Sequence, residues 1–313
     1  MCLLALCGCA ASKSAQTTSK AFMVRPIHFA FNRQTASSNA FQKDTHDEAT
    51  NAKATAEFDN YVKILRENKI DVVVAQDTEA TLTPDSIFPN NWFTTHEDGT
   101  LVLYPMNSEN RRAERKPEFL DTIKQNFNVK KTVDLTHYEG EGQFLEGTGS
   151  MVLDRQNKIV YACRSPRTSE VVLDDFCKQL GYTKVVFDAL DKGGKQIYHT
   201  NVMMSVGEDF AILCKDSIAT EDQRQAVISS LEAHGKKLIS ITFDQMDNFA
   251  GNMLEMKNSE GINILLMSDT AYGSLSEDQL NEIKTHCQIV HVGLNTVEVT
   301  GGGSARCMIA ELY

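Results

Sequence analysis

In the segment His199-Thr200-Asn201-Val202-Met203-Met204-Ser205-Val206-Gly207-Glu208-Asp209-Phe210-Ala211-Ile212-Leu213, a polar start leads into an apolar strand, a polar turn and a second apolar strand. Two short apolar runs around a Gly-containing turn predict a β-hairpin. The same layout begins at Asn91, Glu146 and Asn252, and a half-built copy begins at Cys307 and ends at Tyr313. These five first residues lie 55, 53, 53 and 55 positions apart. A fixed period of this size indicates a repeat architecture.

Apolar residues at helical spacing occupy the segments between the hairpins. The predicted helices are 52–68, 111–126, 169–180, 221–234 and 274–287, and Ser274-Leu275-Ser276-Glu277 is predicted to cap the last one. A short apolar strand follows each of the first four helices, as in Asp71-Val72-Val73-Val74. The unit is therefore a hairpin, a helix and a further strand.

The half-built fifth unit needs a strand from elsewhere. Ala21–Val24 and Ile27–Ala30 near the start of the chain can supply it. Pairing of the two chain ends would close a ring and remove exposed sheet edges. We therefore expect an α/β fold, a five-bladed αβ propeller, with residues 21–313 as one catalytic domain and residues 1–20 as an uncertain extension. A two-domain α/β protein is the alternative.

The composition is that of an ordinary globular protein, and it limits the kinds of partner that the protein is expected to bind. Of 313 residues, 42% are hydrophobic and 23% charged, and the formal charge is −11. Because no basic tract stands out, neither nucleic acid nor an anionic membrane is expected as the main partner. A small-molecule substrate is expected instead, and a homodimer stays open.

The cysteines and the first residues of the chain give information on the cellular compartment of the protein. Eight cysteines occur without zinc-finger spacing, which indicates reduced thiols and a cytoplasmic protein. The apolar Met1–Ala11 is far shorter than the ~20 residues of a membrane span. Its Leu6–Cys9 run leaves a lipid anchor as an alternative, and a start codon set too early, with the fold beginning near Met23, as another.

Equivalent positions in a ring of repeats face one axis. The first residue of each repeat, here called its register position, is Asn91, Glu146, His199, Asn252 or Cys307. A carboxylate, an imidazole and a thiol on one axis form a set suited to covalent catalysis. Each of these residues alone is more often structural, so the shared register carries the prediction. For Asn252 we favour a role in satisfying backbone groups near the axis.

Several motifs together resemble the guanidino-group-modifying, or amidinotransferase, superfamily, whose fold is the pentein propeller. They are Met23–Pro26, Thr83–Trp92, Glu146–Gly149, Ser165–Thr168, Tyr198–Asn201 and Gly301–Met308. The branch most similar to this chain is that of citrulline-utilisation hydrolases. The resemblance implies that Cys307 is the nucleophile, that His199 transfers protons and that Glu146 stabilises the transition state. It implies no metal and no cofactor.

Departures from that superfamily bear on the substrate. Guanidine-specific relatives carry acidic residues where this chain has Asn90, Asn91 and Asn201. A guanidinium offers only donors and favours carboxylates, whereas a neutral ureido group suits an amide. The three asparagines thus favour a ureido substrate such as citrulline, unless they only cap turns or strand ends.

The remaining motif residues are expected to hold the amino-acid end of the substrate. Asp85 could bind the α-ammonium group or a ureido nitrogen, or could serve only an Asx turn. The resemblance implies that Arg167 binds the substrate carboxylate, with Arg111 or Arg112 as alternatives. For each arginine a solvated surface charge is the ordinary explanation.

The predicted activity is hydrolysis of citrulline to ornithine, ammonia and carbon dioxide. Deimination of arginine or a related guanidine and amidino transfer are the enzymatic alternatives. A propeller that only binds a ligand is the non-enzymatic one.

Overall fold

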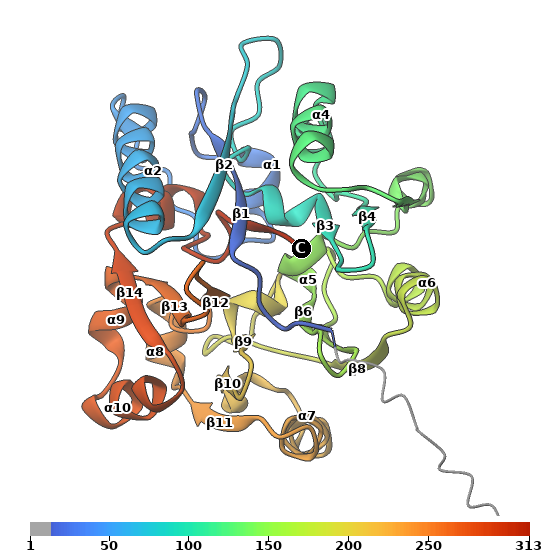
Figure 1. Ribbon diagram of the computed structural model, residues 1–313, viewed down its shortest axis with the longest axis vertical. Helices are drawn as coiled ribbons and strands as arrows, with labels where there is room; N and C mark the ends of the chain where they lie inside the picture. Colours follow the sequence, from blue (N-terminus) through green and yellow to red (C-terminus); the bar gives the residue numbers. More distant parts are fainter. Residues whose placement is uncertain (1–13) are drawn as a thin grey trace, which may run out of the picture.

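Five three-stranded sheets make up the framework of the computed structural model, which describes residues 14–313. The predictions made for Met1–Ala11 lie outside these residues. The sheets are β15 (Ala310–Leu312), β1 (Lys20–Arg25) and β2 (Asp71–Gln76); β3 (Phe93–Thr95), β4 (Thr100–Leu103) and β5 (Lys131–Asp134); β6 (Val152–Asp154), β7 (Ile159–Cys163) and β8 (Thr183–Phe187); β9 (Met204–Val206), β10 (Phe210–Leu213) and β11 (Lys237–Ser240); and β12 (Leu254–Lys257), β13 (Asn263–Ser268) and β14 (Gln288–Val292). Figure 1 shows them arranged around a common centre with helices at the periphery.

Every sheet has the same strand pattern. The middle strand pairs antiparallel with one neighbour and parallel with the other, as β4 does with β3 and β5. The antiparallel pair is the predicted hairpin, or the pairing of the two chain ends in the case of β1. The parallel partner is the apolar run that follows the helix. The repeat predicted from the period is confirmed.

The two ends of the chain meet in one sheet. β1 pairs antiparallel with β15, with Lys20 opposite Leu312 and Phe22 opposite Ala310. Ala21–Val24 therefore supplies the missing strand as predicted, whereas Ile27–Ala30 forms no strand. The ordered fold also begins before residue 21, because the Gln16 side chain donates to the carbonyl of Leu153 at 2.9 Å and to that of Val206 at 3.1 Å.

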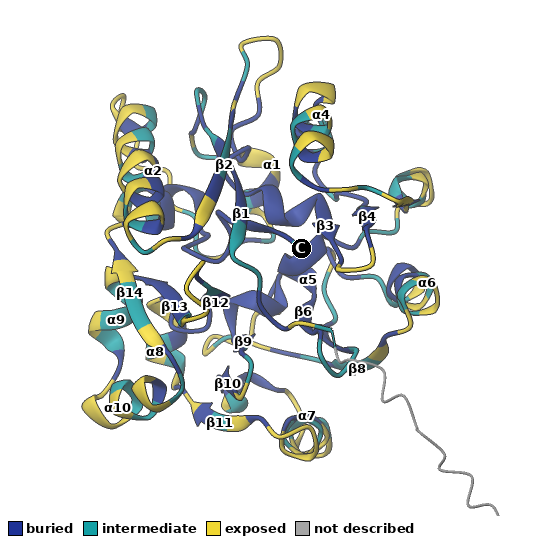
Figure 2. Ribbon diagram, in the orientation of Figure 1, coloured by how far each residue is buried: buried dark blue, intermediate teal, exposed yellow. Residues whose placement is uncertain are grey.

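The longer helices lie outside the sheets and bury only their inner faces, whereas α5 (Gly147–Ser150) lies near the centre and is buried throughout (Figure 2). The helices are α1 (Arg33–Ala36), α2 (Thr50–Glu67), α3 (Glu109–Arg112), α4 (Pro117–Asn126), α5, α6 (Glu170–Leu180), α7 (Glu221–Ala233), α8 (Phe243–Asp247), α9 (Asp269–Ser274) and α10 (Glu277–His286). In α6, for example, Val172, Leu173 and Phe176 are buried at i, i+1 and i+4 spacing.

Of the predicted helices, one is split in two and another begins later than predicted. The segment 111–126 breaks before Pro117, which begins α4 because proline suits the first helical turn. The helix predicted over 274–287 is α10, which begins at Glu277, because Ser274 is the last residue of α9. The capping box at α10 is made by Ser276 and Gln279, so the predicted box at Ser274 and Glu277 is wrong. The Ser274 hydroxyl instead donates to the Ala271 carbonyl at 2.8 Å.

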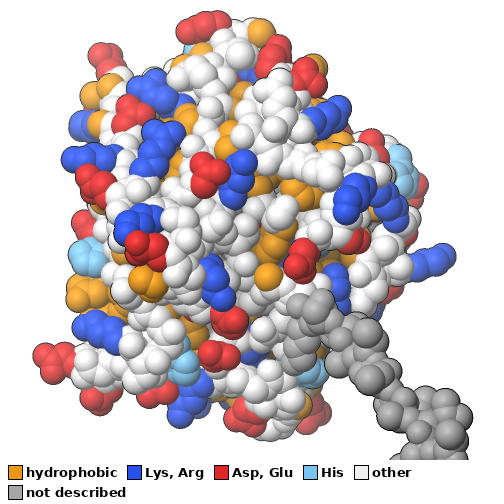
Figure 3. All heavy atoms as spheres, viewed as in Figure 1, with side chains coloured by type: hydrophobic (Ala, Val, Ile, Leu, Met, Phe, Trp, Pro, Cys, Tyr) orange, Lys and Arg blue, Asp and Glu red, His pale blue; other side chains and the backbone are white. Residues whose placement is uncertain are grey.

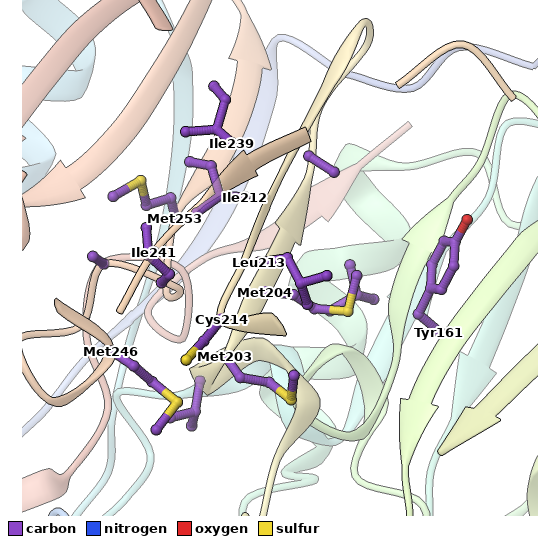
Figure 4. Packing of buried hydrophobic residues seen from close by; sticks show 14 of the residues in the cluster. Tyr161, Met203, Met204, Ile212, Leu213, Cys214, Ile239, Ile241, Met246 and Met253 are labelled. Atoms are coloured by element: carbon purple, nitrogen blue, oxygen red, sulfur yellow. The ribbon is translucent and has the colours of Figure 1, made fainter. Parts of the chain in front are cut away.

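Hydrophobic clusters fill the space between sheets and helices. Figure 4 shows one of them, in which Met203, Met204, Met246 and Met253 pack with the apolar residues of β10. Methionine fits irregular spaces of this kind because its side chain is unbranched and flexible.

The first strand of each hairpin starts later than predicted. β9 begins at Met204 because Thr200–Val202 form a 3₁₀ turn, η3, and β3 follows a similar turn, η1 (Pro89–Asn91). The register positions thus lie in turns before the strands. The direction in which these side chains point is therefore set by the geometry of the turns and not by the pleat of the strands.

Candidate functional site

His199 and Cys307 line one small cavity together with the Gly301–Gly303 loop. The Nε2 atom of His199 lies 2.8 Å from Oε2 of Glu146, which is fully buried. Cys307 is 4% and His199 3% exposed. His199 and Glu146 lie 108 and 161 residues before Cys307 in the chain. The fold nevertheless places His199 on the same cavity as Cys307 and bonds Glu146 to His199.

The carboxylate of Glu146 accepts hydrogen bonds from three groups of the protein. Oε1 accepts from the backbone N–H of Asn107 at 3.0 Å, and Oε2 accepts from His199 and, at 3.4 Å, from Arg167. Burial alone would raise the pKa of Glu146, but the charge of Arg167 and the hydrogen bond from His199 hold that pKa well below its usual range. Glu146 is therefore ionised, and because a carboxylate can only accept, Nε2 of His199 carries its proton.

Two glycines allow the Glu146 turn to pack this closely. Gly147 has a φ of +46°, and a Cβ there would lie 2.3 Å from the carbonyl oxygen of Asn90. A Cβ at Gly149 would lie 2.4 Å from Nδ2 of Asn91 and 2.8 Å from the His199 ring. The Glu146-Gly147-Thr148-Gly149 motif is thus explained by close approach to the imidazole and to η1.

Asp85 lines the same cavity. Its Oδ2 atom accepts from Asn32 at 2.7 Å and lies 3.8 Å from Nε of Arg111, whereas its buried Oδ1 atom has no hydrogen-bond partner among residues 14–313. Burial raises the pKa of Asp85, and the charge of Arg111 and the bond from Asn32 oppose that rise. One carboxylate oxygen is therefore free to accept a donor from a ligand.

Two arginines line the cavity and both are heavily bonded. Arg167 donates to Ser38, to the Thr35 carbonyl and to Glu146, and its guanidinium lies 4.9 Å from the ring centroid of Tyr198. Arg111 donates to Glu114, Asn91 and the Phe88 carbonyl. Neither is the solvated surface charge that is ordinary for arginine.

Arg112, the third candidate, is not among the residues that line the cavity. Its Nε atom donates to the Met106 carbonyl at 3.0 Å, and its side chain is 29% exposed. Of the adjacent pair Arg111 and Arg112, only Arg111 reaches the site.

The asparagines predicted to select the substrate have protein partners. Asn91 lines the cavity, where its Oδ1 atom accepts from Arg111 at 2.8 Å, and Asn90 donates to Thr148 at 3.2 Å. Asn201 lines a different cavity, on which Arg306 and Glu311 also lie, and its Nδ2 atom is 3.5 Å from Sγ of Cys307. The Oδ1 atoms of Asn90 and Asn201 are buried without a partner within the described chain.

The family model described as N,N dimethylarginine dimethylhydrolase, eukaryotic, matches residues 25–313. The chain belongs to this family. It is therefore a member of a hydrolase family within the guanidino-group-modifying superfamily. A search of curated proteins returned no match.

Solved structures share the fold. Apo ArgZ, an arginine dihydrolase from the ornithine-ammonia cycle in cyanobacteria, has a TM-score of 0.74 at 15% identity over 93% of this chain. A variant of AgrE in a complex with L-arginine has a TM-score of 0.74 at 17% identity over 94%. A dimethylarginine dimethylaminohydrolase adduct with S-methyl-L-thiocitrulline has a TM-score of 0.63 at 15% identity over 94%. The chain spans 40% of the ArgZ and AgrE chains and 99% of the last one.

In this family member, residues to which the sequence analysis gave no role of their own complete the cavity. Thr35 and Asn39, which follow β1, line it, as do Phe88 and Tyr198. Asn39 donates to the carbonyls of Gly301 and Gly302, and the Tyr198 hydroxyl donates to Gly302 at 2.6 Å. Tyr198 directly precedes His199 in the chain, so its place at the cavity could have been predicted from the sequence. No periodic pattern distinguishes Thr35 or Asn39.

Neither a membrane span nor a metal site is found in the described part of the family member. Within residues 14–313 no helix is long and apolar enough to cross a bilayer. Over the same range, no three His, Cys, Asp or Glu side chains are grouped as metal ligands. On the face in Figure 3, Lys and Arg alternate with Asp and Glu and form no single basic patch.

Substitution of Gly149 by alanine is expected to lower kcat by about 100-fold, since the new methyl group displaces the His199 ring. Gly140→Ala is the matched control, because nothing lies within 4 Å of a Cβ at that position. Steady-state rates and thermal unfolding of both variants test this. Equal kcat values for the two variants would show that the close contact at Gly149 has no effect on catalysis.

The activity is expected to fall on the acid side of its pH profile only at an unusually low pH. Burial lowers the pKa of His199 to about 4, although the bond to Glu146 opposes this shift. Because the pKa is lowered, the imidazole stays neutral and basic until the pH falls to about 4. We expect kcat/KM to fall with a midpoint near 4 rather than near the ordinary value of about 6.5. A midpoint above 6 in the pH profile, with the fold intact by circular dichroism, contradicts this.

Proposed function

We propose that the protein is a cysteine-dependent hydrolase of the ureido group of an α-amino acid, with citrulline as substrate and ornithine, ammonia and carbon dioxide as products. The observation that carries the proposal is the arrangement of Cys307 and the Glu146-bonded His199 around one cavity. We further propose that the five sheets form a closed five-bladed propeller that acts as one catalytic domain.

The charges near the reacting end favour a neutral group. Glu146 is the carboxylate bonded to His199, and its donors already include a guanidinium, an imidazole and a backbone N–H. A guanidinium would therefore enter beside Arg167, where Glu146 is already bonded, and Asp85 would be the lining carboxylate with an unbonded oxygen to balance it. A ureido group carries no charge, and its N–H groups can be accepted by neutral carbonyl or amide oxygens.

The charged residues of the cavity suit the zwitterionic end of an amino acid. The free Oδ1 atom of Asp85 can accept from an α-ammonium group. Arg111 and Arg167 supply positive charge for an α-carboxylate. The bonds that Arg167 makes to Glu146 and Ser38 also support a second role for it, which is to hold Glu146 ionised.

The chemistry follows from these positions. The sulfur of Cys307 attacks the ureido carbon, and the thiol proton passes through His199 to the departing amine, so that ammonia leaves. Water, deprotonated by His199, then attacks the thioester-like carbon and releases the sulfur. The resulting carbamate loses carbon dioxide to give ornithine. Glu146 compensates the positive charge of the imidazolium in both steps.

A guanidine is the second candidate substrate. The match to the dimethylarginine dimethylhydrolase family and the free oxygen of Asp85 favour it. The structural similarity to ArgZ, an arginine dihydrolase, points the same way at the level of fold. Deimination of arginine would leave citrulline as product, and amidino transfer would need an acceptor amine.

Separate incubations with citrulline, arginine and dimethylarginine test the proposal. Ornithine and ammonia are measured in each, and citrulline is measured in the arginine and dimethylarginine reactions. Equimolar ornithine and ammonia from citrulline alone is the expected result. Citrulline accumulating from either guanidine establishes a deiminase-type activity instead, and ligand binding without products establishes a binding protein.

A further inference from the structure

Two amide groups approach the sulfur of Cys307 from neighbouring repeats. The Nδ2 atom of Asn252 lies 3.2 Å from Sγ and that of Asn201 lies 3.5 Å from it. Both asparagines are 1% exposed. The contact at Asn252 was not anticipated from the sequence, where a backbone-bonding role was favoured.

The orientation of the Asn252 amide is determined by a second hydrogen bond. Its Nδ2 atom also lies 3.0 Å from the backbone carbonyl oxygen of Asn201, which can only accept. The NH₂ group of Asn252 therefore faces the Asn201 carbonyl and the Cys307 sulfur. One of its two hydrogens is available to each of these acceptors. Asn252 thus satisfies a backbone group as predicted and contacts Cys307 as well.

The backbone around Asn252 is built for this close approach. Phe249 has a φ of +62°, which is uncommon for a residue with a side chain. Gly251 follows, and a Cβ there would lie 2.2 Å from the Val202 carbonyl oxygen in the turn that carries Asn201. Only glycine permits the two turns to pack so tightly that both amides reach one sulfur.

The surroundings supply little other stabilisation for a negatively charged sulfur. The titratable and charged side chains that line the Cys307 cavity are Asp85, Arg111, Arg167, Tyr198 and His199. Both arginines are bonded to glutamates, and the lowered pKa of His199 leaves its imidazole neutral at pH 7. The neighbouring Arg306 points away from the site, to Glu311 and the Ile309 carbonyl.

We propose that the Asn252 and Asn201 amides stabilise the thiolate form of Cys307 by donating hydrogen bonds to its sulfur. The inference rests on the proposed function, because the thiolate is the form of the nucleophile that attacks. Whether the thiol proton passes to His199 during the reaction or leaves to solvent when the pH is raised, the negative sulfur receives two N–H donors. When the sulfur attacks the substrate carbon, it becomes a neutral, thioether-like atom. The two hydrogen bonds therefore favour ionisation of the Cys307 thiol before the attack.

The pH dependence of Cys307 alkylation by iodoacetamide, followed by mass spectrometry of the Cys307 peptide, tests the proposal. A hydrogen bond to a charged group commonly changes an equilibrium by about ten- to a hundredfold. We therefore expect Asn252→Ala to lower the alkylation rate at pH 7 by about tenfold or more and to move its midpoint to higher pH. Asn252→Asp keeps the shape, places a carboxylate by the sulfur and is expected to move the midpoint at least as far.

Asn263→Ala on β13 is the matched control, since that side chain bonds to Glu208 and not to the sulfur. Unchanged alkylation profiles in folded Asn252→Ala or Asn252→Asp protein overturn the proposal. The readout is independent of turnover, so an enzyme inactive on every ureido and guanidino compound would refute the proposed function and leave this inference standing.

Discussion

Replacement of Cys307 by alanine is expected to abolish turnover, by at least about a thousandfold, without loss of the fold. Cys307 lies beside His199 on the cavity and is contacted by two amide donors. Alanine removes the only atom of this residue that can bond to the substrate carbon, and loss of a nucleophile commonly costs this much or more. Product release is measured by ornithine and ammonia, and folding by circular dichroism and thermal unfolding.

Cys177→Ala is the control for this prediction. Cys177 lies on α6, is half-buried and does not line the cavity, so its removal should leave the rate unchanged. Incubation of wild-type protein with substrate followed by acid quenching should also leave a mass adduct on the Cys307 peptide. A fully active Cys307→Ala protein would remove this residue from the reaction and, with it, the covalent mechanism.

Deletion of Lys20–Arg25 is expected to abolish cooperative folding. This segment is β1, the central strand between β15 and β2, and its removal leaves both neighbours unpaired. Phe22→Ala tests the same strand more gently. Phe22 is fully buried, with its ring centroid 5.4 Å from that of Phe93 and 6.5 Å from that of Phe119. Its truncation is expected to lower the free energy of unfolding by about 3–5 kcal/mol.

Leu82→Ala is the control for the stability measurements, because that side chain is 67% exposed and should change the free energy of unfolding by less than about 0.5 kcal/mol. Urea denaturation of the three variants and the wild type provides the comparison. If the deletion variant unfolds at the same urea concentration as the wild type, pairing of the chain ends contributes nothing to stability.

Most of the framework could be predicted because the repeat is a local pattern. The four hairpins and the half-built fifth, the strand after each of the first four helices and the pairing of Ala21–Val24 with the chain end all follow from spacing and alternation. The errors occur where a local signal was misread: Pro117 begins a new helix, and Ser276 rather than Ser274 caps α10. Strand starts were placed early because η3 continues the chain as a turn beyond His199.

The site was only partly predictable. Its register indicated that Glu146, His199 and Cys307 share one axis, and the glycines beside Glu146 suggested close packing. The partners of the asparagines and arginines could not be read from spacing. Arg167 resembled a carboxylate ligand, yet it also bonds to Glu146 and to Ser38. Asn252 resembled a backbone cap, yet its second hydrogen lies against a sulfur 55 residues away in the chain.

The order of residues by itself determined the periodic framework and the chemical groups available at each register position, since periodicity and side-chain chemistry are properties of the chain. Only the tertiary structure decided which donor meets which acceptor. The physical reason is that a hydrogen bond requires its two atoms to come within about 3 Å. Such distances depend on turns, glycines and packing from several repeats at once, and no single stretch of the chain specifies them.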